Sequence, residues 1–144
     1  MLTWLEEIKK NSVTFLKTDK VIMNIKLFER KRYPYKNFIE AALCAMIIDN
    51  FKHCGIEASS FTIITPFLDQ QLLLQEHLKA YDVKQILTID KAQGIDCDIV
   101  IISCTKQTPD KGVLLKDLKR LNVALTRAKK KLILIGTEAY LSEI

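Results

Sequence analysis

Short apolar runs of strand length constrain this chain more than any other feature. Runs such as DIVIISC and KKLILIG are apolar along most of their length and do not alternate with polar residues. Strands of that kind are buried on both faces, which is typical of a parallel sheet covered by helices. Amphipathic stretches separate the runs, so the pattern predicts an α/β, doubly wound, mainly parallel sheet with helices on both faces. The 144 residues have the length of a single domain.

The order of these segments predicts the elements of the fold. The expected strands are Val13–Leu16, Phe61–Thr65, Gln85–Ile89, Asp98–Cys104 and Lys131–Gly136. The expected helices are Leu2–Lys9, Phe38–Phe51, Pro66–Ala80, Leu114–Ala128 and a short one from Thr137. Segment 20–36 is basic and is expected to form a loop. Segment 105–113 contains a proline and a glycine, so it is expected to be an exposed connection.

Charge and cysteine content narrow the classes of function. The net charge is +5, and between Lys116 and Lys131 seven Lys/Arg residues accompany one acid, Asp117. A solvated face is the ordinary interpretation of such a run, and a phosphate-bearing partner is the one we favour here. No apolar run reaches the ~18 residues of a membrane span, so no membrane partner is expected. No pair among the four cysteines has C-x-x-C spacing, so no zinc site is expected. The thiols are expected to be reduced.

A phosphate-binding loop is missing from the sequence. The pattern Gly-x-x-x-x-Gly-Lys-Ser/Thr does not occur, and none of the four glycines precedes a lysine and hydroxyl pair. Such a loop cradles β- and γ-phosphates with backbone amides, so no segment of this chain is expected to enclose a triphosphate unaided. An Asp-Glu pair at a strand end, which would position Mg²⁺, is absent as well. No metal ligands are therefore expected among these residues.

The predicted helix 114–128 carries two arginines beside an apolar stripe. Arg120, Ala124 and Arg127 recur at i, i+4 and i+7, and the small alanine leaves room between the guanidinium groups. A planar, permanently charged fork suits phosphate oxygens better than lysine does. Two surface arginines without a role are the alternative. The stripe itself recurs at i, i+3, i+7 and i+10: Leu118, Leu121, Leu125 and Ala128.

The stretch LNVALTRAKKKLILIG resembles motif VI of superfamily 1 helicases, in the 5′-to-3′ group that includes the nonsense-decay helicase. That motif lies in the second RecA-like domain of the family. The resemblance implies that Arg127 is an arginine finger and that Arg120 is a second catalytic arginine near the γ-phosphate, where both bind nucleotide. Lys119 stands where the family has another arginine. An arginine finger stabilises the charge on a transferring phosphoryl group.

A predicted strand–turn–strand unit covers the stretch ILTIDKAQGIDCDIVIISC. Asp90 and Gln93 have the spacing of a capping box, and Gly94 permits a sharp turn. A well-made turn without further role is the alternative. The connection is shorter than the usual parallel crossover, so the relative direction of the two strands stays open.

The same stretch resembles motif V of the family, T-V-D-x-x-Q-G-x-E. The resemblance implies that Gln93 and Gly94 face the nucleotide and that Thr88 contacts the nucleic-acid backbone. Asp96 replaces the more common glutamate and is assigned to the nucleotide as well.

The stretch SFTIITPFLDQQLLL predicts a strand that turns into a helix. Thr65 is a plausible N-cap with Pro66 at the first helical position, and free amides at such a helix start can bind phosphate. A turn capped only for stability is the alternative. The stretch resembles family motif IV, I-I-T-P-Y-x-x-Q, with Phe67 in place of the tyrosine. The resemblance assigns Thr65, Pro66 and Gln70 to nucleic-acid binding.

Two further sites complete the predicted set. Asn37 and Glu40 resemble the family element N-x-x-E-A, and we interpret them as a capping box for the helix that follows. Phe38 stands where some members carry a phosphate-binding arginine. Ser103, at the end of a predicted strand, is assigned to the nucleic-acid-binding group.

The resemblance implies a function as well as a fold. Residues 1–144 would form the second, C-terminal RecA-like motor domain of an ATP-dependent DNA helicase, with 1–36 as its peripheral N-terminal part. Within the family the chain is most similar to the helicase–nuclease branch of replication and repair. ATP and Mg²⁺ would be held mainly by a first RecA-like domain, so the isolated chain is expected to be inactive. Single-stranded DNA and that first domain are the expected partners of a monomer in the nucleus, with the mitochondrion as a second compartment.

Two other functions fit the same sequence. A RecA-like module that binds nucleic acid or protein without catalysis would explain the missing phosphate loop. An RNA helicase of the same superfamily would share these motifs, because backbone contacts carry little base information.

Overall fold

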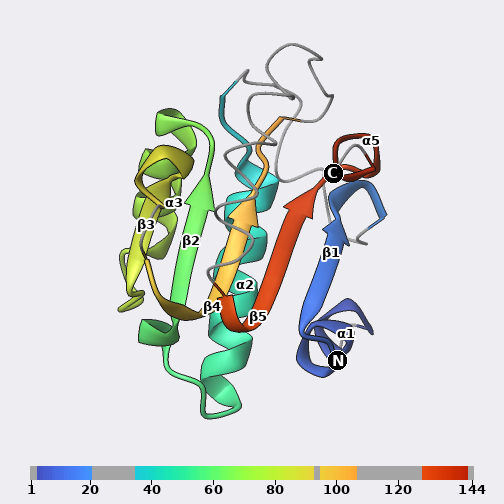
Figure 1. The fold of residues 1–144 in the computed structure, drawn as a ribbon, viewed down its shortest axis with the longest axis vertical. Helices are drawn as coiled ribbons and strands as arrows, with labels where there is room; N and C mark the ends of the chain where they lie inside the picture. The colour runs from blue at the N-terminus through green and yellow to red at the C-terminus, as the bar shows by residue number, and fades with distance from the viewer. Residues whose placement is uncertain (1–2, 21–34, 93–94, 107–127, 143–144) are drawn as a thin grey trace.

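Parallel strands form the centre of this protein (Figure 1). The computed structural model describes residues 3–20, 35–92, 95–106 and 128–142. Five strands pair side by side in the order β1-β5-β4-β2-β3, and every pairing is parallel. The predicted α/β fold of RecA-like type is therefore confirmed. The strands are β1 (Val13–Lys17), β2 (Phe61–Thr65), β3 (Gln85–Thr88), β4 (Cys97–Ser103) and β5 (Ala128–Gly136).

Each central strand buries both of its faces. In β2, β4 and β5, successive residues alternate between two separate apolar clusters, as Ile63 and Ile64 do. All five residues of β2 are buried, which explains why the sequence shows an unbroken apolar run there instead of alternation. β1 is an edge strand, and its alternate residues Val13 and Phe15 are about half exposed.

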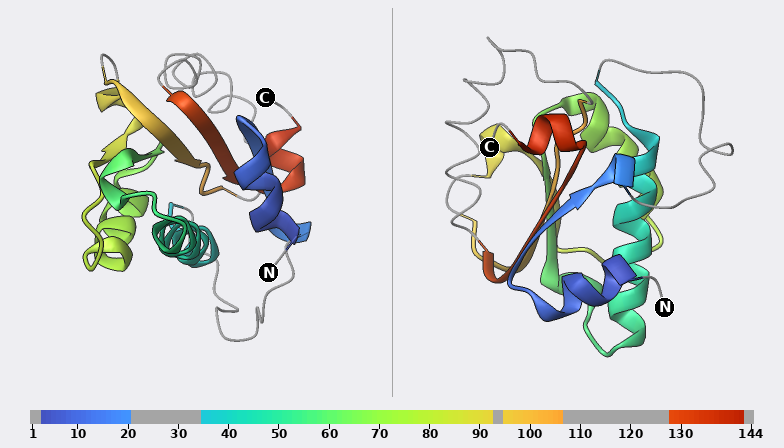
Figure 2. Two further views of the ribbon diagram at one scale, coloured as in Figure 1. Left: turned by 90° about the horizontal axis from the view of Figure 1, so that it is seen from below. Right: turned by 90° about the vertical axis from the view of Figure 1, so that its right-hand side faces the viewer.

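Helices cover the two faces of the sheet unequally (Figure 2). α1 (Thr3–Lys10), α2 (Phe38–His53) and α3 (Leu68–Leu78) pack on one face, where their apolar residues join the larger cluster. α5 (Glu138–Leu141) and the 3-10 helix η4 (Ile89–Lys91) contribute to the smaller cluster on the other face. Two further 3-10 helices are η1 (Thr18–Lys20) and η3 (Ala58–Ser60).

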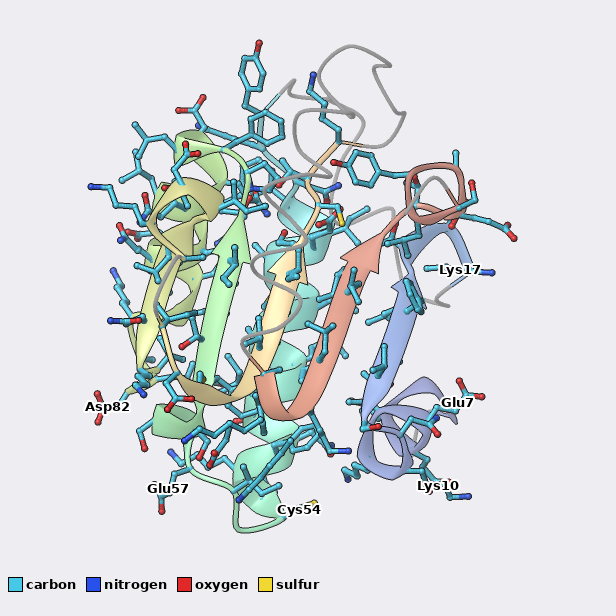
Figure 3. The ribbon with its side chains drawn as sticks, in the orientation of Figure 1. Glu7, Lys10, Lys17, Cys54, Glu57 and Asp82 are labelled. Carbon is cyan, nitrogen blue, oxygen red and sulfur yellow. The ribbon has the colours of Figure 1, made fainter. Side chains whose placement is uncertain are left out.

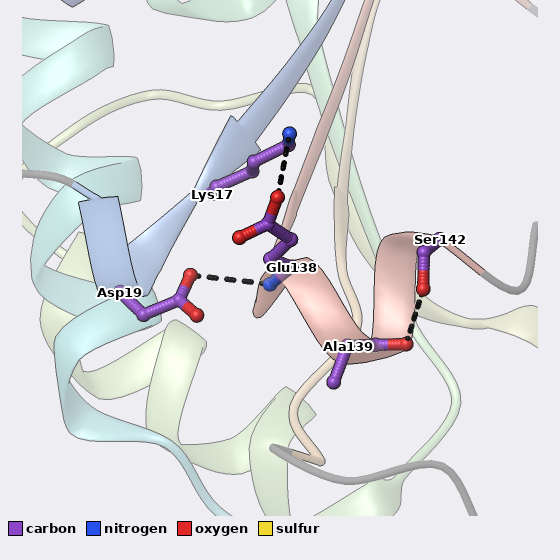
Figure 4. Close-up of polar contacts among 5 residues, drawn as sticks. All are labelled: Lys17, Asp19, Glu138, Ala139 and Ser142. Atoms are coloured by element: carbon purple, nitrogen blue, oxygen red, sulfur yellow. Dashed lines mark hydrogen bonds and ion pairs between the residues drawn. The ribbon is translucent and has the colours of Figure 1, made fainter.

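Polar contacts fix α5 beside the edge strand (Figure 4). Lys17 Nζ lies 3.3 Å from Glu138 Oε1, and the Glu138 backbone N–H donates to Asp19 Oδ1 at 3.1 Å. The Thr137 side chain caps the helix by accepting from the Tyr140 backbone N–H. The chain after β5 is thereby tied to the chain after β1.

Several element boundaries differ from the sequence-based prediction. α3 begins at Leu68 with Phe67 as its N-cap, so the predicted helix start, with Thr65 as cap and Pro66 as first helical residue, is wrong. Ala128 belongs to β5 instead of to a helix, and the rest of the predicted helix 114–128 lies outside the described residues. β3 ends at Thr88, because the chain turns there into η4. Asp90 lies within that 3-10 helix, whose N-cap position is Thr88, so Asp90 is not the N-cap residue there.

The question of strand direction around motif V is settled by the pairing. β3 and β4 both run parallel to β2 and lie on opposite sides of it. The chain therefore returns from the carboxyl end of β3 to the amino end of β4 across the neighbouring strand. We call the edge where the strands end the carboxyl edge, and the opposite edge the amino edge.

Candidate nucleic-acid and nucleotide interface

The carboxyl edge brings together most of the residues predicted to bind nucleic acid. Thr65 ends β2 and Thr88 ends β3, and the two are partners in the parallel register. Ser103 ends β4 on the other side of β2. Parallel strands present their ends on one side of a sheet, so residues from motifs IV and V meet there although they are far apart in the sequence.

Of the five residues predicted to bind nucleic acid, three have side chains buried inside the protein. Thr65, Gln70 and Ser103 have no exposed surface, whereas Pro66 and Thr88 are partly exposed. Gln70 Nε2 donates to the Asn37 carbonyl at 3.1 Å and to Ser103 Oγ at 3.1 Å, and Gln70 Oε1 accepts from the Asn37 N–H at 2.7 Å. Their predicted contact with nucleic acid stays a prediction. In the structure, these three side chains hold the ends of β2 and β4 against the start of α2.

Glu40 lies at the centre of this buried network. Its side chain is fully buried, and Oε1 accepts from Ser103 Oγ at 2.8 Å and from the Thr105 backbone N–H at 2.9 Å. Asn37 Nδ2 lies 3.2 Å from Oε2, which gives the carboxyl a third donor. Burial raises the pKa of Glu40 to about 7 and outweighs the hydrogen bonds from Thr105 and Ser103, which lower it. The carboxyl is therefore poised to change charge near neutral pH.

The capping box predicted at the start of α2 is half formed. The Asn37 side chain accepts from the Glu40 backbone N–H at 3.0 Å, as an N-cap does. The return bond of a capping box would run from the Asn37 N–H to the Glu40 side chain, but that N–H binds Gln70 instead. The Glu40 carboxyl instead binds the Asn37 side chain and reaches Ser103 and Thr105 at the end of β4.

Thr105 is held in an unusual backbone conformation directly after β4. Its φ is +74°, in the left-handed region that β-branched residues rarely adopt. Its N–H binds Glu40 and its carbonyl accepts from Asn37 Nδ2 at 3.1 Å. Its hydroxyl donates to the Ser103 carbonyl and lies 3.0 Å from Thr65 Oγ1. Hydrogen bonds to its N–H, its carbonyl and its hydroxyl together hold this turn in place.

An aromatic and basic cluster lies next to the buried network. The rings of Tyr35 and Phe67 are 5.1 Å apart, and Lys106 Nζ lies 5.5 Å from each ring centroid. Tyr35 is 46% exposed, and Phe67 and Lys106 are partly exposed. We call these three residues the aromatic–lysine cluster. The sequence did not reveal this cluster, because its three residues come from separate segments of the chain.

Asp96 lies at the other edge of the sheet. It directly precedes β4, and its carboxylate pairs with Lys129 Nζ at 3.0 Å near the start of β5. Lys84 Nζ donates to its backbone carbonyl at 2.6 Å. The structure therefore separates Asp96 from Thr65, Thr88 and Ser103, and its assignment to nucleotide binding stays a prediction.

The remaining predicted residues, Gln93, Gly94, Arg120 and Arg127, lie outside the described residues. Ala92 and Ile95 pack into the smaller apolar cluster, as does Ala128, which follows Arg127 in the chain. Ala128 is the register partner of Cys97 at the amino edge. Asp96 and the start of β5 therefore lie near each other at the amino edge.

The described residues offer no metal site or membrane span. Among residues 3–20, 35–92, 95–106 and 128–142, no group of three or more His, Cys, Asp or Glu side chains is arranged to hold a metal ion. Within the same residues, none of the helices combines the length and the apolar character needed to cross a bilayer.

Glu40 and Thr105 are the residues that sequence reasoning missed. The N-x-x-E spacing pointed to Glu40, but we interpreted it as a helix cap with no contact beyond α2. No local pattern marked Thr105, because a left-handed threonine has no sequence signature.

Comparison with known proteins shows what the whole chain is similar to. A family model described as an AAA domain matches residues 2–139. The chain is 36% identical over 148 residues to the DNA replication ATP-dependent helicase/nuclease JHS1 of Arabidopsis thaliana, covering 98% of this chain and 11% of that protein. It is 38% identical over 129 residues to the DNA replication ATP-dependent helicase/nuclease DNA2 of Homo sapiens, covering 88% of this chain and 12% of that protein.

The yeast relative gives a consistent result. The chain is 33% identical over 147 residues to DNA2 of Saccharomyces cerevisiae, covering 98% of this chain and 10% of that protein. The chain therefore spans about a tenth of the length of these curated relatives. The similarity confirms the resemblance to helicases of superfamily 1.

Proposed function

The chain belongs to the AAA domain family, as a superfamily 1 helicase domain similar to DNA2, and we propose that it is the second motor domain of an ATP-dependent DNA helicase. In this proposal residues 1–144 are one RecA-like domain that closes on a first domain of the same protein. The first domain holds ATP and Mg²⁺ through its phosphate loop. The full protein would act in DNA replication and repair in the nucleus, and in the mitochondrion as a second compartment.

One observation supports this proposal most. Predicted strand-binding residues from motifs IV and V meet at the carboxyl edge, whereas Asp96 and the residue after Arg127 meet at the amino edge. A motor domain needs two separate surfaces, one for the nucleic acid and one for the nucleotide. In this proposal the carboxyl edge of the sheet serves the nucleic acid and the amino edge serves the nucleotide.

The nucleotide surface would act through charge. Arg127 and Arg120 would be directed at the γ-phosphate, where a planar guanidinium can donate two parallel hydrogen bonds. Such donors lower the barrier only if they are stronger in the transition state than in the ground state. Gln93 and Gly94 would line the same side. Asp96 would keep a fixed position because Lys129 and Lys84 hold its side chain and backbone.

The strand surface would act mainly through backbone contacts. Thr88 and Pro66 are partly exposed at the carboxyl edge, and the aromatic–lysine cluster lies beside them. A cation and aromatic faces are the groups that bind single strands with little sequence preference. Closure of the cleft on ATP would move this edge relative to the first domain and shift the grip on the strand.

Arginine substitution in the full-length protein tests the proposal. Arg127→Ala should lower kcat for DNA-stimulated ATP hydrolysis by about 10³- to 10⁵-fold, which is typical of an arginine finger. Lys130→Ala is the matched control, because Lys130 is an exposed basic residue in the neighbouring β5 segment. Turnover that is unchanged in Arg127→Ala would refute the finger assignment. Equal affinity for matched RNA and DNA strands would argue against a DNA-specific helicase.

A further inference from the structure

Glu40 is a buried carboxyl for which the helicase motifs provide no role. A carboxyl group without exposed surface costs free energy unless hydrogen bonds compensate its lost hydration. Glu40 accepts three such bonds, and none of them comes from a charged side chain. An apolar residue would fill this position without that cost. The arrangement therefore has a purpose other than filling the core.

The network around Glu40 reaches the backbone of three segments. Through Asn37 it fixes the chain that follows Tyr35, because the Asn37 N–H and carbonyl both bind Gln70. Through Thr65, whose hydroxyl accepts from the Phe67 N–H at 3.4 Å, it reaches the start of α3. Through Thr105 it fixes the residue before Lys106. The three residues of the aromatic–lysine cluster therefore lie on or next to backbone segments that this network holds.

The Thr105 turn directs Lys106 toward the rings. A threonine with φ of +74° is strained unless its surroundings hold it, and Glu40 and Asn37 bind its N–H and its carbonyl. Lys106 follows this turn and lies over both Tyr35 and Phe67. Without the bond to Glu40, the turn would lose the acceptor for its buried N–H. The backbone would then relax and Lys106 would move off the rings.

We propose that Glu40 is a positioning residue for single-strand binding, because it fixes the Thr105 turn and thereby holds Lys106 against Tyr35 and Phe67. The ligand is a single strand of nucleic acid. Its bases would stack on the exposed aromatic faces and its phosphate would pair with the lysine. This inference rests on the proposed strand surface, but it assigns the contact to the aromatic–lysine cluster and its support to Glu40.

Two substitutions of Glu40 separate positioning from charge. Leucine is apolar and accepts no hydrogen bond, whereas glutamine keeps one carbonyl oxygen that can accept from Ser103 and Thr105. In the full-length protein, Glu40→Leu should raise the Kd for a single-stranded DNA oligonucleotide by about ten-fold, a typical effect of losing one stacked base. Glu40→Gln should keep the wild-type Kd. Equal loss in both variants would show that the charge matters instead, and would overturn the proposal.

Controls separate this effect from general destabilisation. Phe51→Leu weakens the same core at the far end of α2, where Phe51 packs edge-on against Phe61. That variant should lower Tm but leave the Kd for DNA unchanged. Both Glu40 variants should leave KM for ATP unchanged. A rise in the Kd of Phe51→Leu that matches that of Glu40→Leu would assign the whole effect to stability and overturn the proposal.

Asn37→Ser gives a second test in case Glu40→Leu fails to fold. Serine still caps α2, but it lacks the Nδ2 group that binds Glu40 and the Thr105 carbonyl. This variant should lower Tm, as Phe51→Leu does, because two buried acceptors lose a donor, but unlike Phe51→Leu it should raise the Kd for DNA. A wild-type Kd in Asn37→Ser overturns the proposal.

Lys106→Gln distinguishes failure of this inference from failure of the proposed strand surface. It should reduce the salt dependence of DNA binding by about one phosphate contact. If it does so while Glu40→Leu binds DNA normally, the positioning role is refuted and the strand surface stands. If neither variant changes binding, both are refuted at this edge.

Discussion

Lys129 Nζ lies 3.0 Å from Asp96 Oδ2, and this ion pair joins the end of motif V to the end of motif VI. The pairing raises the pKa of Lys129, chiefly through the hydrogen bond to Asp96. Both side chains are more than half exposed, so the pair contributes little to stability. The parallel pairing of β4 with β5 sets the start of β5 beside Asp96, the residue predicted to face the nucleotide.

Asp96→Asn should affect nucleotide use more than stability. We expect Tm to stay near the wild-type value and KM for ATP to rise by roughly ten-fold, as expected for loss of a hydrogen bond to a charged group. Asp98→Asn is the matched control, because Asp98 pairs with Lys130 at 3.6 Å at the start of the same strands. Steady-state kinetics of the full-length protein would check this. Equal KM values in the wild type and Asp96→Asn would remove Asp96 from the nucleotide site.

Glu40 should make stability depend on pH. Its pKa is about 7 in the folded protein, above the ordinary glutamate value of 4.5, so the folded state binds a proton more tightly than the unfolded state does. The contribution of Glu40 to stability is fully present below pH 4.5 and is lost as the pH rises through 7. The total loss of unfolding free energy is on the order of 3 kcal/mol.

Chemical unfolding of the wild type and Glu40→Gln between pH 4.5 and 8 would measure this contribution. The wild type should lose free energy of unfolding relative to the variant across that range. Glu57→Gln serves as a control, since Glu57 is an exposed carboxylate near the amino edge, where Figure 3 labels it. Parallel pH curves for the wild type and Glu40→Gln would contradict the shifted pKa.

Lys131 and Lys130 should differ in their effect on stability although they are neighbours. Lys131 Nζ donates to the carbonyls of Ile8, Lys9 and Asn11 at 2.8 to 2.9 Å, at the end of α1. Lys131→Met should cost about 1–3 kcal/mol, because these carbonyls lose a charged donor. Lys130→Met removes one exposed ion pair and should cost well under 1 kcal/mol. Thermal unfolding would rank the two, and equal costs would show that Lys131 does not cap α1.

The isolated chain should bind single strands but not turn over ATP. It lacks a phosphate loop, so its arginines have no enclosed triphosphate to act on. Purified residues 1–144 should show no DNA-stimulated phosphate release, and their binding to DNA should weaken steeply as salt rises. Robust hydrolysis by this chain alone would contradict its assignment as a second motor domain.

Some features of the fold could be predicted from local patterns. Runs such as Phe61–Thr65 are apolar throughout because both faces of their strands are buried. Helix α2 was also predictable, since Asn37 caps it as its spacing with Glu40 suggested. Boundaries that depend on tertiary contacts were less predictable. Phe67, which is a poor cap by propensity, is the N-cap of α3, whereas the Thr65 hydroxyl contacts Thr105 in the buried network.

The sequence by itself determined the strand pattern, the family and the residue types of the motifs, because these depend on local periodicity and spacing. Only the tertiary structure decided where those residues face. Parallel pairing placed Thr65 beside Thr88 and sent Asp96 to the opposite edge. Burial then turned Glu40 from a helix cap into the centre of a hydrogen-bond network. Both outcomes depend on contacts between distant segments, which no local pattern encodes.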